Sequence, residues 1–84
     1  MKKEITIKDT IKEILHKNFK GTKYSRFNEY HLNKEIKSDI YVRYTYEVSN
    51  YCYIRIHHNL ELKEIEFRLW DKFNLLQKHN IQYI

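Results

Sequence analysis

The chain has 84 residues, 42% of them hydrophobic, with a formal net charge of +5, no proline, one glycine and one cysteine. This length fits one compact domain, residues 1–84, and the hydrophobic share argues against intrinsic disorder. The lone Cys52 cannot form an internal disulfide, and the sequence contains neither a signal-peptide pattern nor an apolar run of membrane-spanning length. We therefore expect a cytoplasmic domain that does not enter a membrane.

The positive charge is concentrated in the first half of the chain. Residues 1–38 contain ten Lys or Arg and five Asp or Glu, whereas residues 39–84 contain six of each. The cations able to attract phosphate form a candidate basic patch of Lys8, Lys12, Lys20, Lys23 and Arg26. Surplus lysines that only keep a small protein soluble are an equally simple interpretation.

Residues 7–19 are predicted to form an amphipathic helix. Apolar residues recur there at intervals of three and four, which places them on one stripe: Ile7, Ile11, Ile14, Leu15 and Phe19. Thr6 is the expected N-cap, and Gly21 is expected to follow the end of the helix.

The middle of the chain alternates between polar and apolar residues, which predicts strands. Residues 40–48 and 52–57 would form a hairpin with a three-residue turn at residues 49–51. Only this register collects the apolar side chains on one face, with Tyr46 opposite Ile54 and Val48 opposite Cys52. Residues expected to be buried on this face are Val42, Tyr44, Tyr46, Cys52, Ile54 and Ile56.

A third strand is expected over residues 29–36, joined to the hairpin by a turn at residues 37–39. This turn would place Ile36 opposite Ile40 and Leu32 opposite Tyr44. Lys34 interrupts the apolar face, as is common on an edge strand.

Residues 60–79 are predicted to form a second helix with Asn59 as N-cap. Its apolar stripe would consist of Leu62, Ile65, Leu69, Phe73 and Leu76. Phe67 and Trp70 fall outside this stripe and form a candidate protein-binding patch, unless residues 20–28 fold over them.

The expected fold is α+β, a two-layer sandwich in α-β-β-β-α order, with two helices covering one face of a three-stranded antiparallel meander. This order resembles the double-stranded-RNA-binding domain. That family has a Gly-Pro-x-His-like loop and a Lys-Lys-x-x-Lys-like cluster, where this chain has Lys-Ser-Asp at 37–39 and Leu-Glu-Leu-Lys-Glu at 60–64. The resemblance therefore concerns topology, and RNA binding is not carried over.

No motif indicates catalysis, a metal or a cofactor. Cys52 and His58 would be about 20 Å apart on one strand, too far for a nucleophile and its base, at about 3.3 Å per residue. The neighbours His57 and His58 would point to opposite faces and would not share a metal ion. A ribonuclease-like toxin would suit the size and charge, with an acid–base set of His31, Tyr53, Arg55 and His57.

The open face of the expected sheet is the main candidate for binding. Its residues are types that anchor protein interfaces and also stack on bases: Tyr41, Arg43, Tyr53, Arg55 and His57, with His31, Asn33 and Thr45 beside them. Tyrosines that only favour strands are the plain alternative.

The function expected first is stoichiometric binding to a larger protein or nucleoprotein complex, without enzymatic activity. Half of the chain is Ile, Lys, Asn, Tyr or Phe, residues with AT-rich codons, which suggests a gene from an AT-rich bacterium, phage or mobile element. An inhibitor of a host nucleic-acid-handling defence system, of the anti-CRISPR type, would fit. The alternative is a module that binds single-stranded nucleic acid or RNA directly, and the third hypothesis is the ribonuclease-like toxin.

Overall fold

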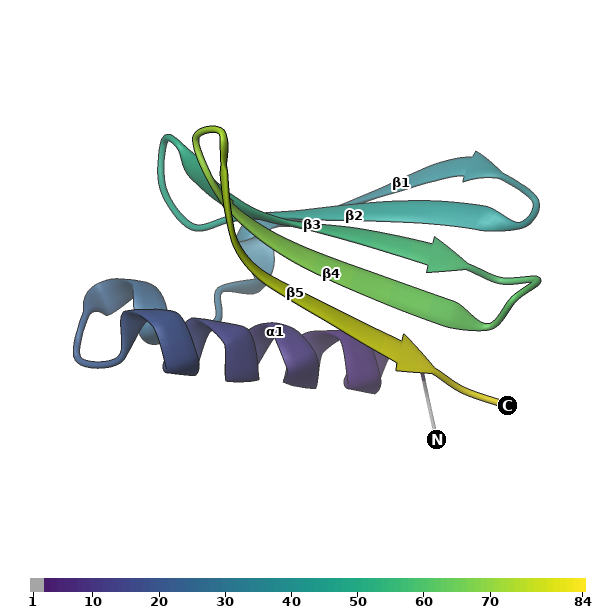
Figure 1. The fold of residues 1–84 in the computed structure, drawn as a ribbon, viewed down its shortest axis with the longest axis horizontal. Helices are drawn as coiled ribbons and strands as arrows, with labels where there is room; N and C mark the ends of the chain where they lie inside the picture. The colour runs from purple at the N-terminus through teal and green to yellow at the C-terminus, as the bar shows by residue number, and fades with distance from the viewer. Residues whose placement is uncertain (1–2) are drawn as a thin grey trace.

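The computed structural model describes residues 3–84, in which one helix covers one face of a five-stranded antiparallel sheet (Figure 1). The elements are α1 (Lys3–Phe19), the short 3-10 helices η1 (Lys23–Ser25) and η2 (Glu29–His31), and the strands β1 (Leu32–Ser38), β2 (Tyr41–Glu47), β3 (Cys52–Asn59), β4 (Glu64–Asp71) and β5 (Asn74–Gln82). The strands lie in the sheet in chain order. None of the described helices is long and apolar enough to span a membrane.

The α+β class is correct, but the predicted three-stranded meander with two helices is wrong. Residues 64–82 form the β4–β5 hairpin instead of a second helix. Two periodicities compete in this stretch, because Ile65 and Leu69 fit both a helical stripe and one face of a strand. Phe67 decides between them, since it is fully buried between these two residues on the strand and would face away from the stripe on a helix.

Pairing with β3 explains why residues 64–71 form a strand and not part of a helix. β3 carries four buried side chains on one face, and a free edge on such a strand would leave its backbone groups unpaired. β4 pairs with β3 along its whole length, from Asn59 opposite Glu64 to Cys52 opposite Asp71. Asn59 caps a turn and not a helix: its Oδ1 accepts hydrogen bonds from the N–H groups of Glu61 and Leu62.

The core lies between α1 and one face of the sheet. The predicted stripe of α1 is confirmed, with Ile7, Ile11, Ile14 and Leu15 buried and Phe19 packed at its margin. α1 begins at Lys3, before the predicted cap at Thr6, and Gly21 follows its end with a φ of 85°. The sheet contributes buried residues from β2, β3 and β4, which are Val42, Tyr44, Tyr46, Cys52, Ile54, Ile56, His58, Ile65, Phe67 and Leu69.

The predicted hairpin of β2 and β3 is confirmed in its register. Tyr46 lies opposite Ile54, and the N–H of Val48 donates to the carbonyl of Cys52 at 2.9 Å across the 49–51 turn. All six side chains predicted to be buried on this face are buried.

β1 is present but pairs two residues away from the predicted register. Ile36 lies opposite Val42 rather than Ile40, and Leu32 lies opposite Tyr46. The turn is tighter than expected, because Ser38 still belongs to β1 and a bulge after Ile36 absorbs the extra residue. A shift of two residues keeps each side chain on its predicted face.

The helix side of β1 is left partly uncovered, since there is one helix where two were expected. Figure 1 shows α1 lying next to β5, whereas β1 swings away from it. Asn18 of α1 donates a hydrogen bond to Gln77 of β5 at 2.7 Å, while Ile36 of β1 remains 71% exposed.

Candidate functional site: the open face of the sheet

The face of the sheet opposite α1, called the open face here, carries the alternate side chains of all five strands. These residues are Asn33 and Glu35, Tyr41, Arg43 and Thr45, Tyr53, Arg55 and His57, Glu66, Arg68 and Trp70, and Lys78 and Asn80. Those on the three central strands are partly buried, because neighbouring long side chains cover one another.

A row of cations crosses the centre of the open face. Arg55 lies directly opposite Arg68, and Arg68 lies directly opposite Lys78. Like charges in opposite positions of a sheet destabilise it, so this arrangement has a cost unless an anion offsets it. We call Arg55, Arg68 and Lys78 the cation row.

Carboxylates of the open face pair with Arg43, Arg68 and Lys78 but not with Arg55. Glu66 Oε1 lies 2.8 Å from Arg68 Nε, and Glu66 Oε2 lies 3.6 Å from Lys78 Nζ. Arg43 donates to Glu35 at 2.6 Å. Arg55, by contrast, has no carboxylate within ion-pair distance among the described residues. Its charge is therefore available to a partner.

The arginine side chains of the open face are partly removed from solvent. Nε of Arg55 is buried and has no hydrogen-bond acceptor in the described part of the chain, and the same holds for Nε of Arg43. A charge with less water around it interacts more strongly with an approaching anion.

An aromatic band, defined as Tyr53 and Trp70, lies beside the cation row. The two residues are directly opposite each other on β3 and β4, with Leu75 of β5 opposite Trp70. The Arg55 guanidinium carbon lies 5.3 Å from the centre of the Tyr53 ring. This contact holds the arginine above the aromatic band, so that one partner group can meet both.

His57 lies on the other side of the cation row and stacks on Tyr41. The two rings are parallel within 3°, with centroids 5.7 Å apart, and the Tyr41 hydroxyl is hydrogen-bonded to His57 Nδ1. Burial lowers the pKa of His57 from its usual 6.5, and the neighbouring arginines lower this pKa further, whereas Glu66 opposes them.

His57 is expected to titrate below pH 6.5 in an NMR titration of the folded protein. Glu66→Gln removes the carboxylate that opposes the shift, so this variant should lower the midpoint further. Because the folded state binds the proton less well than the unfolded state, His57 should favour folding above pH 6.5 and lose this contribution as the pH falls below it. Glu64→Gln is the matched control, and a midpoint above 6.5 would contradict the expectation.

The candidate basic patch is not part of the open face. Its lysines and Arg26 belong to α1 and to residues 20–26, on the other side of the sheet. Lys8 forms an ion pair with Glu29 at 2.7 Å, and Lys12 lies over the ring of Phe27. Lys20, Lys23 and Arg26 are exposed in the segment that follows α1.

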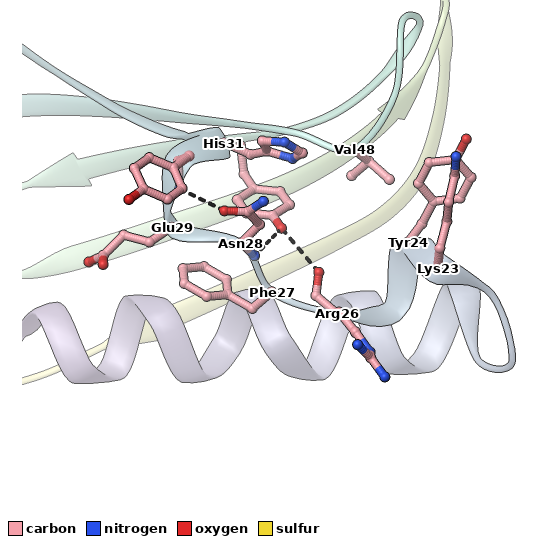
Figure 2. Close-up of a pocket in the computed structure, with 10 residues that line it drawn as sticks. Lys23, Tyr24, Arg26, Phe27, Asn28, Glu29, His31 and Val48 are labelled. Atoms are coloured by element: carbon pink, nitrogen blue, oxygen red, sulfur yellow. Dashed lines mark hydrogen bonds between the residues drawn. The ribbon is translucent and has the colours of Figure 1, made fainter.

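That segment encloses a groove of about 550 Å³ against the end of β2. Its lining residues, all outside the open face, are Lys23, Tyr24, Arg26, Phe27, Asn28, Glu29, Tyr30, His31, Tyr46 and Val48. Figure 2 shows Lys23 and Tyr24 on one side of this hollow, His31 on the other, and Val48 above it.

The structure brings together Tyr41, Arg43, Tyr53, Arg55 and His57 on the open face, where the sequence placed them, and adds Trp70 to the same face. Phe67 lies in the core and not in an exposed patch, because it points to the opposite side of β4. The proposed ribonuclease set is divided, since His31 belongs to η2 and lines the groove. Cys52 and His58 are buried at opposite ends of β3, and burial raises the pKa of the Cys52 thiol.

Sequence reasoning missed Glu66, Arg68 and Lys78 as residues of the open face. All three fell in the predicted second helix. The available signal was the alternation of charged and apolar residues over residues 64–69, which is typical of a strand with one buried face.

Comparisons with models of protein families, with curated proteins and with solved structures found no match.

Proposed function

We propose that this chain is a binding module whose open face docks on an acidic, partly apolar surface of a larger protein. The observation that carries the proposal is Arg55, a central arginine that faces Arg68 and has no carboxylate partner within the described residues. Tyrosine, tryptophan and arginine in a well-packed centre are the residue types that dominate protein interfaces.

The distribution of charge favours a protein over a nucleic acid. Glu35 and Glu66 lie on the open face among its cations, and Glu47 lies opposite Tyr53 at its margin. Such mixed signs suit a patterned protein surface and would repel parts of a continuous phosphate backbone. Apolar surface also continues beyond the aromatic band, because Leu75 of β5 is 45% exposed and Phe73, in the turn between β4 and β5, is 95% exposed.

The finer part of the proposal is that the module acts as a stoichiometric inhibitor of a host nucleic-acid-handling defence system. It is supported by the composition of the chain, which suggests a phage or mobile element, and by the partly exposed aromatic and arginine side chains on the open face of a small sheet. An inhibitor of this kind binds over the functional site of its partner and blocks it. This needs a binding surface but no chemical reaction.

Direct binding of single-stranded nucleic acid is the second candidate. The structure adds Arg68 and Lys78 to a face on which the sequence already placed Arg43 and Arg55 beside aromatic side chains. Bases stacked on Tyr53 and Trp70, with phosphates on the cation row, would give this mode of binding.

Affinity capture from a nuclease-treated lysate of the host organism tests the proposal. We expect the wild-type chain to retain a protein in a fixed ratio, with binding that weakens only mildly at moderate salt. Arg55→Glu should lose this protein, whereas Lys17→Glu, an equal charge change on the exposed side of α1, should retain it.

A gel-shift series with short RNA and DNA tests the alternative that the chain binds nucleic acid directly. If the three residues of the cation row each contact one phosphate, the logarithm of the binding constant should fall with the logarithm of the salt concentration with a slope of about −2, since each phosphate contributes about −0.7. Tight binding with this slope by the purified chain alone would replace the protein hypothesis with the nucleic-acid one.

A further inference from the structure

The segments that line the groove next to β2 are held in place by hydrogen bonds and ring contacts. The Tyr46 hydroxyl accepts a hydrogen bond from the N–H of Asn28 at 2.8 Å and donates one to the carbonyl of Arg26 at 3.3 Å. The rings of Phe27 and Tyr46 stack with centroids 5.3 Å apart. These contacts hold residues 26–28 against the buried end of β2, so the hollow does not depend on a ligand for its shape.

The other wall is held by local hydrogen bonds. The Thr22 hydroxyl donates to the carbonyl of Phe19 at 2.7 Å and accepts from the N–H of Tyr24 at 3.2 Å. The Tyr24 ring also meets the edge of Phe19. This side of the groove is therefore anchored to the end of α1.

The lining combines aromatic surfaces with a positive charge. Lys23 Nζ lies 5.3 Å from the centre of the Tyr24 ring, and no carboxylate is within ion-pair distance of it in the described chain. Glu29, the acidic residue of the lining, is paired with Lys8 and points away from Val48 (Figure 2). In Figure 2 the guanidinium of Arg26 points away from Val48 and His31, so we take Lys23, which lies over the Tyr24 ring, as the cation of the groove.

We propose that this groove binds a small planar aromatic anion. The ring would lie against Tyr24, and its anionic group would meet Lys23, with His31 as a further polar partner. The volume of about 550 Å³ is within the range of small-molecule sites, roughly 300–1,000 Å³. A nucleotide and an aromatic carboxylate share this chemistry.

The site is independent of the proposed function. Tyr46 and Val48 point to the helix side of β2, whereas Arg55 and Trp70 point to the open face. Both surfaces can therefore be occupied at the same time.

NMR titration of the isotope-labelled chain tests this site. The probes are adenosine monophosphate and 4-hydroxyphenylacetate, with adenosine and inorganic phosphate as the separate halves of the nucleotide. We expect at least one aromatic anion to shift the amide signals of Tyr24, Asn28 and His31 and to saturate at about 1 mM or below. The separate halves should bind roughly tenfold more weakly, because ring and charge act together. The stronger of the two anions identifies the ligand source.

Lys23→Gln should weaken binding roughly five- to tenfold, whereas Lys17→Gln, which removes the same charge from α1, should leave it unchanged. Tyr24→Leu removes a ring of the groove without changing charge and should weaken the aromatic anions but not phosphate. The proposal is overturned if both anions leave these amides unshifted at about 10 mM, or if Lys23→Gln and Lys17→Gln weaken binding equally. Shifts confined to the open face would overturn it as well.

Discussion

Phe67→Ala is expected to destabilise the domain by about 3–5 kcal/mol, a large share of the roughly 5–15 kcal/mol by which a domain is stable. The Phe67 side chain is fully buried in the centre of β4, opposite Ile56 of β3 and His79 of β5. Its removal would leave a cavity between the sheet and α1, and well-packed surroundings fill such a cavity only in part.

Urea unfolding followed by circular dichroism measures this effect. Phe73→Ala is the matched control, because Phe73 is 95% exposed in the turn between β4 and β5 and its removal should change stability by less than about 0.5 kcal/mol. A helix over residues 60–79 would reverse the two results, since it buries Phe73 and exposes Phe67. The pair of variants thus tests the hairpin itself.

The double variant Tyr53→Ala/Arg55→Ala is expected to lose at least about a hundredfold in affinity for the captured protein. The guanidinium carbon of Arg55 lies 5.3 Å from the centre of the Tyr53 ring, and each of the two side chains should also contact the partner. Their joint loss removes an aromatic surface and the unpaired charge from the centre of the open face, while the buried side of β3 remains intact.

Surface plasmon resonance with both single variants gives the coupling between the two anchors, which should differ from zero for residues in contact. The matched control is Tyr24→Ala/Arg26→Ala, the same pair of residue types on the groove side of the molecule. Equal losses in the two double variants would contradict the open face as the docking surface. Thermal unfolding of each variant separates lost binding from lost folding.

The hairpin of β2 and β3 could be predicted from the local sequence pattern, because the alternation of residues and the length of the turn indicate the same register. Strict alternation selects the face, and only the three-residue turn brings Tyr46 opposite Ile54 on that face. The candidate residues on these two strands followed directly, since their orientation depends on period 2 and not on what the rest of the chain does.

The hairpin of β4 and β5 could not be predicted in the same way. The turn that leads into β4 uses Lys63 with a φ of 53°, and the turn between β4 and β5 uses Lys72 with a φ of 55°, where glycine or asparagine would be the usual signal. Ile65 and Leu69 fit either period, so the local pattern favours neither structure strongly. The placement of Arg68, Trp70 and Lys78 on the open face depended on this choice.

The sequence by itself determined the α+β class, α1, the register of β2 and β3 and the half of the open face that these strands carry. Each of these follows from contacts between residues close in sequence, where periodicity and turn length agree. Only the tertiary structure decided between helix and hairpin for residues 64–82, because the free edge of β3 and the space above α1 are absent from any local window. That choice placed Arg68 opposite Arg55 and thereby made the cation row, since residues far apart in sequence become neighbours only through the pairing of their strands.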